Sequence, residues 1–595
     1  MDIEPVAANE SKSRATKWWS DSAEATKIAP AREERLFLLV SIFIGIISGL
    51  LVVSFRMAID WLRILLLGSS PNSGQHRLII VPALAGLLIA LLTRYFFPNV
   101  RGSGINQTKA ALYIHNGYIS VRTVIGKFLL SALAIGSGHS LGPEDPSLQI
   151  GAGVASFISR KLGMSKTKLR IFAPIGAAAG LAAAFNAPIS AILFVIEEVI
   201  GQWSAAVLGS IVLAAVSSVV VARWFWGAEP MFRIPPVNLR DPRELLAYAV
   251  LGIFGGVASL LFARALEYLR PKLRSQPAWS QLLQPAMAGL VVGGIGYFGF
   301  PQVMGAGYEA IDQAMHSQFT WTMLLALSLL KIVATTVSFS SGTPGGMFAP
   351  TLFVGAMLGA AVGTFEKIYF PHLTGSVGSY ALVGMGVLFA AFLRAPLTSV
   401  FMVLEVSGNY SIVLPVILAN TIAYVIARHW QPEPIFELMT HQDGLYLPSM
   451  EEQREESNLH LEDAMRPVDV PVLQASGTLE EAAKELAQHG GLKDVPLALV
   501  RYPNGHWYAI TQEELAAIFA NPEGKDGAAG ASRTLGKRLG MERTPLLYPD
   551  LPLDSVLPYF KRWPLLPIAN RAIIGSLEGM VSLDDVLKRY QQREH

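Results

Sequence analysis

The feature that most constrains this chain is the shortage of charge between residues 36 and 428. Of the 595 residues, 52% are hydrophobic and only 15% are Asp, Glu, Lys or Arg, whereas soluble domains carry about 25% charged residues. Residues 36–55 and 78–97 are apolar runs long enough to cross a hydrocarbon core about 30 Å thick. The pattern predicts a polytopic α-helical membrane domain.

The bulk composition excludes several other classes. A net charge of +2 does not indicate nucleic-acid binding, and the absence of cysteine excludes disulfides, thiol catalysis and cysteine-held metals. Residues 1–34 are polar, without the apolar core of a signal peptide. Because Lys and Arg side chains lie just before the first apolar run, we expect the N-terminus in the cytoplasm. Without an organellar targeting signal, we expect a multi-pass protein of the plasma (inner) membrane with both termini in the cytoplasm.

After the second apolar run, the pattern becomes irregular. The next apolar segments are short and interrupted by Gly, Pro and Asn, which is typical of discontinuous membrane helices. They lie at 128–138, 146–158, 171–185, 188–200 and 204–222. A polar, proline-rich stretch at 230–243 precedes a second series of such segments.

The two halves of the domain, at about 35–228 and 244–430, resemble each other. Three stretches of the first half recur in the second, in the same order and at a nearly constant separation. The pairs are 98–104 with 301–307, 146–151 with 350–355, and 187–197 with 395–405. An internal repeat of this kind places a substrate site near the membrane midplane, between the repeats. The sequence leaves open whether the repeat is inverted or parallel.

The informative positions are those at which the repeats differ. Three polar residues of the first half align with an apolar residue in the second: Ser103 with Ala306, Glu144 with Phe348, and Glu198 with Val406. By contrast, Glu197 aligns with Glu405. Because both halves need a similar scaffold, we interpret Glu197 and Glu405 as structural and the three unmatched residues as functional. Drift between duplicated halves is the alternative.

Residues 142–151 hold two acids, Glu144 and Asp145, between prolines in an otherwise apolar region. A carboxylate at membrane depth costs several kcal/mol unless something pairs with it or it faces water. The prolines and glycines predict a break in the helix here. A broken helix that holds an acid inside a membrane indicates a transport site. A surface loop between two helices is the alternative.

After residue 428 the sequence becomes that of a soluble α/β protein. An acidic linker at 439–462 leads to two small βαββα units, at 463–520 and 535–592, which are joined by a Gly/Ala-rich linker at 521–534. The predicted strands are 470–473, 495–501, 507–510, 544–548, 565–569, 572–577 and 579–581. The predicted helices are 479–489, 512–519, 553–560 and 583–590. Thr478 and Glu481 form a capping box for the first of these helices.

Residues 36–438 resemble the CLC chloride channels and chloride/proton antiporters, and the tail resembles a tandem pair of CBS domains. The matching motifs are Gly102-Ser103-Gly104-Ile105, Gly142-Pro143-Glu144-Asp145-Pro146, Phe185-Asn186-Ala187-Pro188, Gly345-Gly346-Met347-Phe348-Ala349-Pro350 and Arg394-Ala395-Pro396-Leu397-Thr398. The resemblance implies a CLC-type inverted-repeat fold with discontinuous helices, and a membrane domain that ends near residue 438. It implies a homodimeric transporter, not an enzyme, with one anion pathway in each subunit.

The resemblance also implies an anion site built from helix N-termini, which offer unpaired N–H groups and a partial positive charge. The residues that match the family's chloride ligands are Ser103, Gly104, Ile105, Met347, Phe348 and Phe436. Glu144 matches the gating glutamate, which as a carboxylate occupies an anion site and once protonated admits chloride. A bound anion favours the neutral form of a nearby carboxyl, so anion occupancy and protonation are coupled.

Glu198 distinguishes two kinds of transport. It matches the internal proton-transfer glutamate of the antiporters, whereas passive channels tend to have an apolar residue there. We therefore expect a secondary active antiporter that exchanges chloride for protons. A passive voltage- or pH-gated chloride channel is the alternative, and in a third interpretation Glu197 and Glu198 are both structural caps.

Four residues depart from the family pattern. Pro143 replaces a common basic residue, Asp145 a usual glycine, Asn106 a usual proline, and Phe436 a tyrosine whose hydroxyl touches the central anion. Losing that hydroxyl weakens anion binding by about 0.5–1.5 kcal/mol. Asp145 either tunes the proton affinity of the gate or faces extracellular water.

Two further features of the sequence suggest other functions. Ser582 and Asp585 resemble the Ser/Thr-x-x-Asp motif that holds ribose hydroxyls in CBS pairs, so an adenine nucleotide is a candidate ligand; a structural dimerisation module is the alternative. Transport itself needs no cofactor beyond chloride as the bound substrate. Ser137 and His139 suggest an intramembrane enzyme, but residues two apart do not face each other on a helix, and no acid is evidently placed to orient the histidine.

Overall fold

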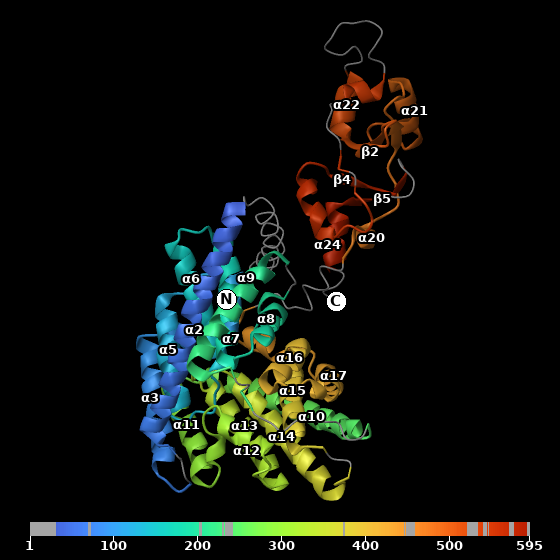
Figure 1. The fold of residues 1–595 in the computed structure, drawn as a ribbon. Coiled ribbons are helices and arrows are strands. Elements are labelled where there is room, and N and C mark those ends of the chain that lie inside the picture. The colour runs from blue at the N-terminus through green and yellow to red at the C-terminus, as the bar shows by residue number, and fades with distance from the viewer. Residues whose placement is uncertain are drawn as a thin grey trace. The chain divides into compact units, whose positions relative to one another are not determined.

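The computed structural model describes most of the chain, which divides into two compact units, Met1–Met450 and Glu451–His595. The described residues are 31–69, 73–201, 205–228, 231–232, 242–372, 375–445, 447, 459–520, 534–539, 544–545, 547–570 and 576–591. Over these ranges, eight helices are long and apolar enough to cross a membrane. The first unit is therefore polytopic and helical, as predicted (Figure 1).

The helices of the first unit form two series in the same order (Figure 1). The first series is α2 (Ala31–Leu67), α3 (Arg77–Tyr95), η1 (Pro98–Val100), α4 (Gly104–Tyr113), α5 (Val121–Gly136), α6 (Glu144–Lys161), α7 (Lys166–Phe185), α8 (Pro188–Phe194), the π-helical turn η2 (Val195–Ile200) and α9 (Ala205–Trp226). The second is α10 (Glu244–Arg274), α11 (Ala278–Tyr297), η3 (Pro301–Val303), α12 (Tyr308–Met315), α13 (Trp321–Ser340), α14 (Phe348–Tyr369), α15 (Val377–Leu393), α16 (Pro396–Ser407), η4 (Tyr410–Ile412), α17 (Val413–Trp430) and α18 (Ile435–Gln442).

The first membrane helix is longer than predicted. Residues 36–55 were expected to form it, but α2 continues to Leu67. The extension carries Arg56, Asp60 and Arg63, whose charges look in sequence like the end of a membrane segment. These three side chains line a cavity, so the helix continues without exposing them to lipid.

The two halves are inverted relative to each other, which the sequence had left open. Helices α3 and α11 are equivalent, because Pro82 and Gly86 recur as Pro285 and Gly289. Gly86 lies against Pro285 and Gly289 lies against Pro82. Residue numbers thus rise along one helix as they fall along the other. Two equivalent helices that run antiparallel are related by a two-fold axis perpendicular to the helix axes. The repeat is therefore inverted.

Glycines allow the central helices of each half to cross closely. A Cβ on Gly151 of α6 would overlap the Gly176 carbonyl of α7. In the second half, a Cβ on Gly355 of α14 would overlap the Gly384 carbonyl of α15. The same crossing therefore occurs twice, and it buries helices α6 and α14 inside the unit.

The C-terminal unit contains two small sheets. Its elements are α20 (Leu461–Ala464), β1 (Val472–Gln474), α21 (Leu479–Gln488), β2 (Leu497–Arg501), β3 (Trp507–Thr511), α22 (Gln512–Ala520), α23 (Leu535–Arg538), η5 (Leu553–Lys561), β4 (Leu565–Ala569), β5 (Leu577–Ser582) and α24 (Leu583–Gln591). Strand β2 pairs in parallel with β1 and antiparallel with β3. Strand β4 pairs antiparallel with β5 and forms one parallel bridge, from Ile568 to Leu547. The two sheets therefore share one topology, the second in reduced form.

Most of the predicted elements of this unit are present. The capping box is confirmed, with the Thr478 amide donating to Glu481 at 3.0 Å and the Glu481 amide donating to the Thr478 hydroxyl at 3.2 Å. The predicted helix 553–560 is instead the 3₁₀ element η5, which contains Pro558 and so lacks one backbone donor. The predicted strand 544–548 is reduced to the Leu547 bridge, and most of the predicted strand 572–577 lies outside the described residues.

The glycine crossings predict a selective loss of stability. We expect Gly355→Ala to destabilise the protein by about 1–3 kcal/mol, because its Cβ has no room against α15. Thermal unfolding monitored by size-exclusion chromatography of detergent-solubilised protein measures the effect. Gly294→Ala on α11 is the control, because nothing lies within 4 Å of a Cβ there. Equal melting temperatures for the two variants would contradict the role of the crossing.

Candidate anion and proton site

The candidate site begins where equivalent residues of the two halves meet. The Gly142 amide donates to the Gly346 carbonyl, and the Gly346 amide donates to the Gly142 carbonyl, both at 2.8 Å. This exchange brings together the starts of α6 and α14. The predicted helix break is confirmed, because α5 ends at Gly136 and α6 begins at Glu144. The intervening residues are all buried, so the alternative of a surface loop is wrong.

Glu144 is the first residue of α6, and its side chain is fully buried. Its Oε1 accepts a hydrogen bond from the hydroxyl of Tyr308, the first residue of α12. The Arg56 guanidinium lies 5.7 Å from the centroid of the Tyr308 ring. Glu144 is therefore held from the second half of the unit, through a residue that the sequence analysis did not single out.

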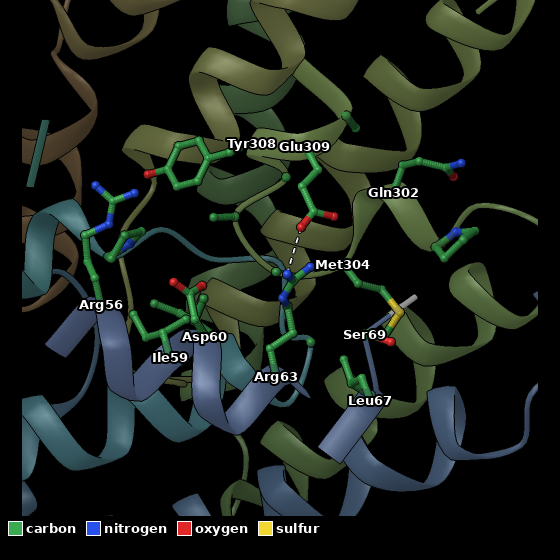
Figure 2. A pocket seen from close by; sticks show the side chains of 18 of the residues that line it. Arg56, Ile59, Asp60, Arg63, Leu67, Ser69, Gln302, Met304, Tyr308 and Glu309 are labelled. Carbon is green, nitrogen blue, oxygen red and sulfur yellow. Dashed lines mark ion pairs between the residues drawn. The ribbon is translucent and has the colours of Figure 1, made fainter. Parts of the chain in front are cut away.

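A cavity of about 410 Å³ lies between α2 and the start of α12 (Figure 2). Its lining includes Tyr308, the hydrogen-bond partner of Glu144, and Pro143, its neighbour in the chain. Charged residues of both signs surround it, and Figure 2 shows Arg63 of α2 reaching Glu309 of α12, with which it forms an ion pair at 2.7 Å. The cavity therefore brings charged side chains of both signs close to the hydrogen-bond partner of Glu144.

Asp145 is also fully buried, so the prediction that it faces extracellular water is wrong. Its Oδ2 accepts a hydrogen bond from the Ser103 hydroxyl at 3.1 Å and from the Met347 amide at 3.3 Å. Ser103 caps α4, and Met347 stands at the N-cap position of α14 without a capping side chain. The side chain therefore joins two helix starts, one from each half.

The six residues expected to bind chloride are all buried. Ser103 accepts a hydrogen bond from the Ile105 amide at 3.2 Å, while Gly104 packs against the Asp145 backbone carbonyl. The ring of Phe348 packs edge-on against that of Phe436 of α18, with centroids 6.4 Å apart. The structure thus gathers the predicted residues from α4, α14 and α18 around the start of α6.

Two of the departures from the family pattern contact each other. The Asn106 amide group donates to the backbone carbonyl of Phe436 at 3.1 Å. This hydrogen bond joins α4 to the first turn of α18.

Two buried lysines support the loops in front of α4 and α12. Lys127 of α5 donates to the carbonyls of Val100 at 3.2 Å and Gly102 at 2.6 Å. Lys331 of α13 donates to the carbonyls of the equivalent residues, Val303 at 2.9 Å and Gly305 at 2.7 Å. This pair was not predicted, although a lysine that recurs at the repeat separation inside an apolar segment is a signal visible in the sequence.

Glu197 and Glu405 are structural, as the repeat comparison predicted. Glu197 accepts hydrogen bonds from the Thr398 amide at 3.0 Å and hydroxyl at 2.7 Å, at the start of α16. Glu405 accepts a hydrogen bond from the Ser190 amide at 2.7 Å and another from its hydroxyl, at the start of α8. Each glutamate caps a helix of the other half, because helix starts inside a membrane need acceptors that water cannot supply.

Glu198 has a different partner from its neighbour. Its carboxylate forms an ion pair with Lys109 of α4 at 2.9 Å, and only 10% of its side chain is exposed. The π-helical turn η2 contains both Glu197 and Glu198 and directs them to different elements. The third interpretation, in which both glutamates cap helices, therefore holds for Glu197 alone.

The remaining candidates have backbone or side-chain partners of their own. Ser137 donates to the Ala134 carbonyl and a His139 ring nitrogen lies 3.2 Å from the Pro82 carbonyl, so they do not form a catalytic pair. The described residues contain no group of three or more His, Asp or Glu side chains with metal-binding geometry.

In the C-terminal unit, the Asp585 carboxylate accepts hydrogen bonds from the Ser582 hydroxyl at 2.6 Å and the Arg466 guanidinium at 3.0 Å. Burial alone would raise the pKa of Asp585, but these hydrogen bonds hold it below its usual value. Helix capping and an ion pair therefore already account for both motif residues, Ser582 and Asp585.

The inverted repeat and the gathered helix starts define a multi-pass helical membrane protein of the transport class. The sequence model of the family described as "Voltage gated chloride channel" matches residues 85–428. The chain belongs to this family, which is a family of transporters and not of enzymes.

Two relatives show how similar the sequence is to known members. The chain is 32% identical over 417 residues to a protein named "H(+)/Cl(-) exchange transporter ClcA" from Salmonella arizonae, covering 67% of this chain and 87% of that protein. It is 32% identical over 402 residues to "Putative chloride channel protein ClcB-like" from Ralstonia nicotianae, covering 66% of this chain and 93% of that protein.

Solved structures share the fold. One, titled as a slow cyanobacterial Cl⁻/H⁺ antiporter, has a TM-score of 0.62 and 24% identity and covers 70% of this chain and 99% of the other. Another, titled as a eukaryotic CLC transporter, has a TM-score of 0.59 and 19% identity and covers 92% of this chain and 97% of the other. These likenesses establish the CLC fold for the membrane unit.

Glu197 and Glu405, which each cap a helix of the other half, should contribute similarly to stability. We expect Glu197→Gln and Glu405→Gln each to destabilise the protein by about 1–3 kcal/mol, because each weakens the charged acceptor of a buried helix start. Melting temperatures of the purified protein measure the effect, with Glu309→Gln as a control because that side chain is 69% exposed. A large effect at one glutamate and none at the other would contradict their equivalence.

Proposed function

We propose that this protein is a secondary active antiporter that exchanges chloride for protons across the membrane. The proposal rests on relatives named as H⁺/Cl⁻ exchange transporters and on the arrangement of two acids in the membrane unit. Glu144 and Glu198 are both largely buried, and Glu198 pairs with Lys109 where its neighbour Glu197 caps a helix of the other half. A passive pore has no use for a second buried carboxyl with its own cation partner, so Glu198 is the observation that carries the proposal.

Each acid has a distinct part in the proposed exchange. Glu144 is the gate, and its Tyr308 partner lies between it and the cavity that Arg56 and Arg63 line. When Glu144 is protonated or displaced, chloride enters a site formed by Ser103, Gly104, Ile105, Met347, Phe348 and Phe436. Glu198 passes protons between the opposite solution and the interior, and Lys109 stabilises its charged form.

The assembly follows from the same proposal. The protein acts as a homodimer with one anion pathway in each subunit, lies in the plasma (inner) membrane and has both termini in the cytoplasm. The C-terminal unit is a pair of CBS domains, which its two sheets of shared topology support. Adenine-nucleotide binding through Ser582 and Asp585 stays a prediction.

Proton coupling is tested by replacing Glu198. In liposomes that contain the purified protein, an imposed chloride gradient should drive protons uphill. We expect Glu198→Val to reduce proton movement to the level of protein-free liposomes while chloride flux persists. Glu366→Gln, which alters another buried carboxyl of this unit, should leave the coupling intact. Chloride flux without proton movement in the unmodified protein would establish the passive channel instead.

Gating is tested by replacing Glu144. We expect chloride flux through the unmodified protein to rise as the pH falls, because protonation of the gate removes the charge that excludes chloride. In Glu144→Gln this pH dependence should be lost when flux is measured at saturating chloride, because the amide gate is neutral at every pH. Chloride efflux measured with an ion-selective electrode across a pH series gives the answer. A variant that keeps the full pH dependence would show that Glu144 is not the gate.

A further inference from the structure

The carboxylate of Asp145 lies where the proposed function needs a chloride ion. Its Oδ2 takes hydrogen bonds from the Ser103 hydroxyl at 3.1 Å and the Met347 amide at 3.3 Å. These two groups, one from each half of the inverted repeat, are donors that the proposed chloride site would use. A chloride ion and this carboxylate therefore compete for the same hydrogen bonds.

The surroundings of Asp145 suit an exchangeable anion. The side chain has no exposed surface, and its Oδ1 has no hydrogen-bond donor among the described residues. The donors to Oδ2 are neutral, so they hold a negative charge without forming an ion pair. Gly346 leaves the space that the carboxylate occupies, because a Cβ there would lie 2.6 Å from Oδ1. The starts of α4 and α14 add a positive potential at the same point.

Few charged groups face this carboxylate. Glu144 precedes it on α6, and Lys127 on α5 is the cation whose field reaches it. The Lys127 ammonium group is itself bound to the carbonyls of Val100 and Gly102. The first turns of α4 and α14 contain no acidic residue. Asp145 is therefore held mainly by the two neutral donors and not by a salt bridge.

We propose that Asp145 is a tethered anion that occupies the inner chloride site, and that chloride binds there only after this carboxylate is displaced or protonated. The inference rests on the proposed function, because it takes Ser103 and Met347 as chloride ligands. It adds a second carboxyl, separate from the gate, whose protonation is coupled to chloride occupancy. Chloride binding is thereby weak at high pH even when Glu144 is neutral.

Isothermal titration of chloride into the full-length purified protein tests the inference. The Glu144→Gln variant is the background, because its gate carries no charge. Adding Asp145→Ala should tighten chloride binding at least about tenfold, since a competing charge is removed from the site. Adding Asp145→Asn, which removes the charge but keeps the shape, should give an intermediate affinity. Adding Glu366→Gln, another buried acid of this unit, should leave the affinity unchanged.

A pH series on the background variant provides a second test that needs no change at Asp145. Between about pH 8 and about pH 5, its chloride affinity should rise about tenfold, because protonation neutralises the competing carboxylate. With Asp145→Ala the affinity should be independent of pH. A pH-independent affinity in the background variant would overturn the inference.

The remaining outcomes separate the two proposals. Equal or weaker chloride binding after Asp145→Ala, in protein that elutes as one folded species, overturns the tethered anion and leaves the antiporter intact. If no variant binds chloride, the chloride site itself is wrong, and both proposals fall. A tighter affinity in both Asp145 variants together with loss of the pH dependence supports the inference.

Discussion

The membrane unit depends on how it satisfies helix starts that lie away from water. The first N–H groups of a helix have no partner within the helix, and the bilayer offers none. At α8 and α16 this need is met permanently, by Glu405 and Glu197 from the opposite half. At α14 it is met by the Asp145 carboxylate, which also takes the hydroxyl that caps α4. Structural capping and anion binding are thus the same chemistry, and they differ in whether the acceptor can be exchanged.

The inverted repeat explains the position of the Asp145 carboxylate, which is the proposed exchangeable acceptor. The two-fold axis passes near the Gly142–Gly346 exchange, so the starts of α6 and α14 meet there. A strictly symmetric protein would present the same group twice at that point. This chain instead has Glu144 at one start and Phe348 at the other. Glu144 supplies a carboxylate that can be protonated, and the Phe348 ring is an apolar surface from the equivalent position of the other half.

Much of this architecture could be predicted from the sequence because it depends on local patterns. The lengths of the apolar runs predicted the membrane segments. The comparison of the two repeats distinguished Glu198, which has no acidic counterpart, from Glu197, which has one. The inversion of the repeat could not be predicted, since it depends on which faces of α3 and α11 meet. Tyr308 and Lys109, the partners of Glu144 and Glu198, could not be predicted for the same reason. A hydrogen bond between elements far apart in the chain produces no pattern in the sequence.

The burial of Asp145 shows where pattern reasoning misleads. An acid between prolines at a helix break can face water or the interior, and the two cases have the same sequence. The outcome was decided by Ser103 and Met347, which arrive from other helices and offer donors that water would otherwise supply. The alternative in which Asp145 faces water is therefore wrong. The alternative in which it tunes the proton affinity of Glu144 stays a prediction.

Under the proposed mechanism, the departures at Asp145 and Phe436 act on anion binding in the same direction. Phe436 offers a ring where a hydroxyl would donate to the anion, and Asp145 adds a carboxylate that takes the donors that remain. Both changes lower the occupancy of the inner site by chloride, one by removing a favourable contact and the other by competition. The second effect is reversible by protonation and the first is not. A transporter built this way depends on pH at its binding step as well as at its gate.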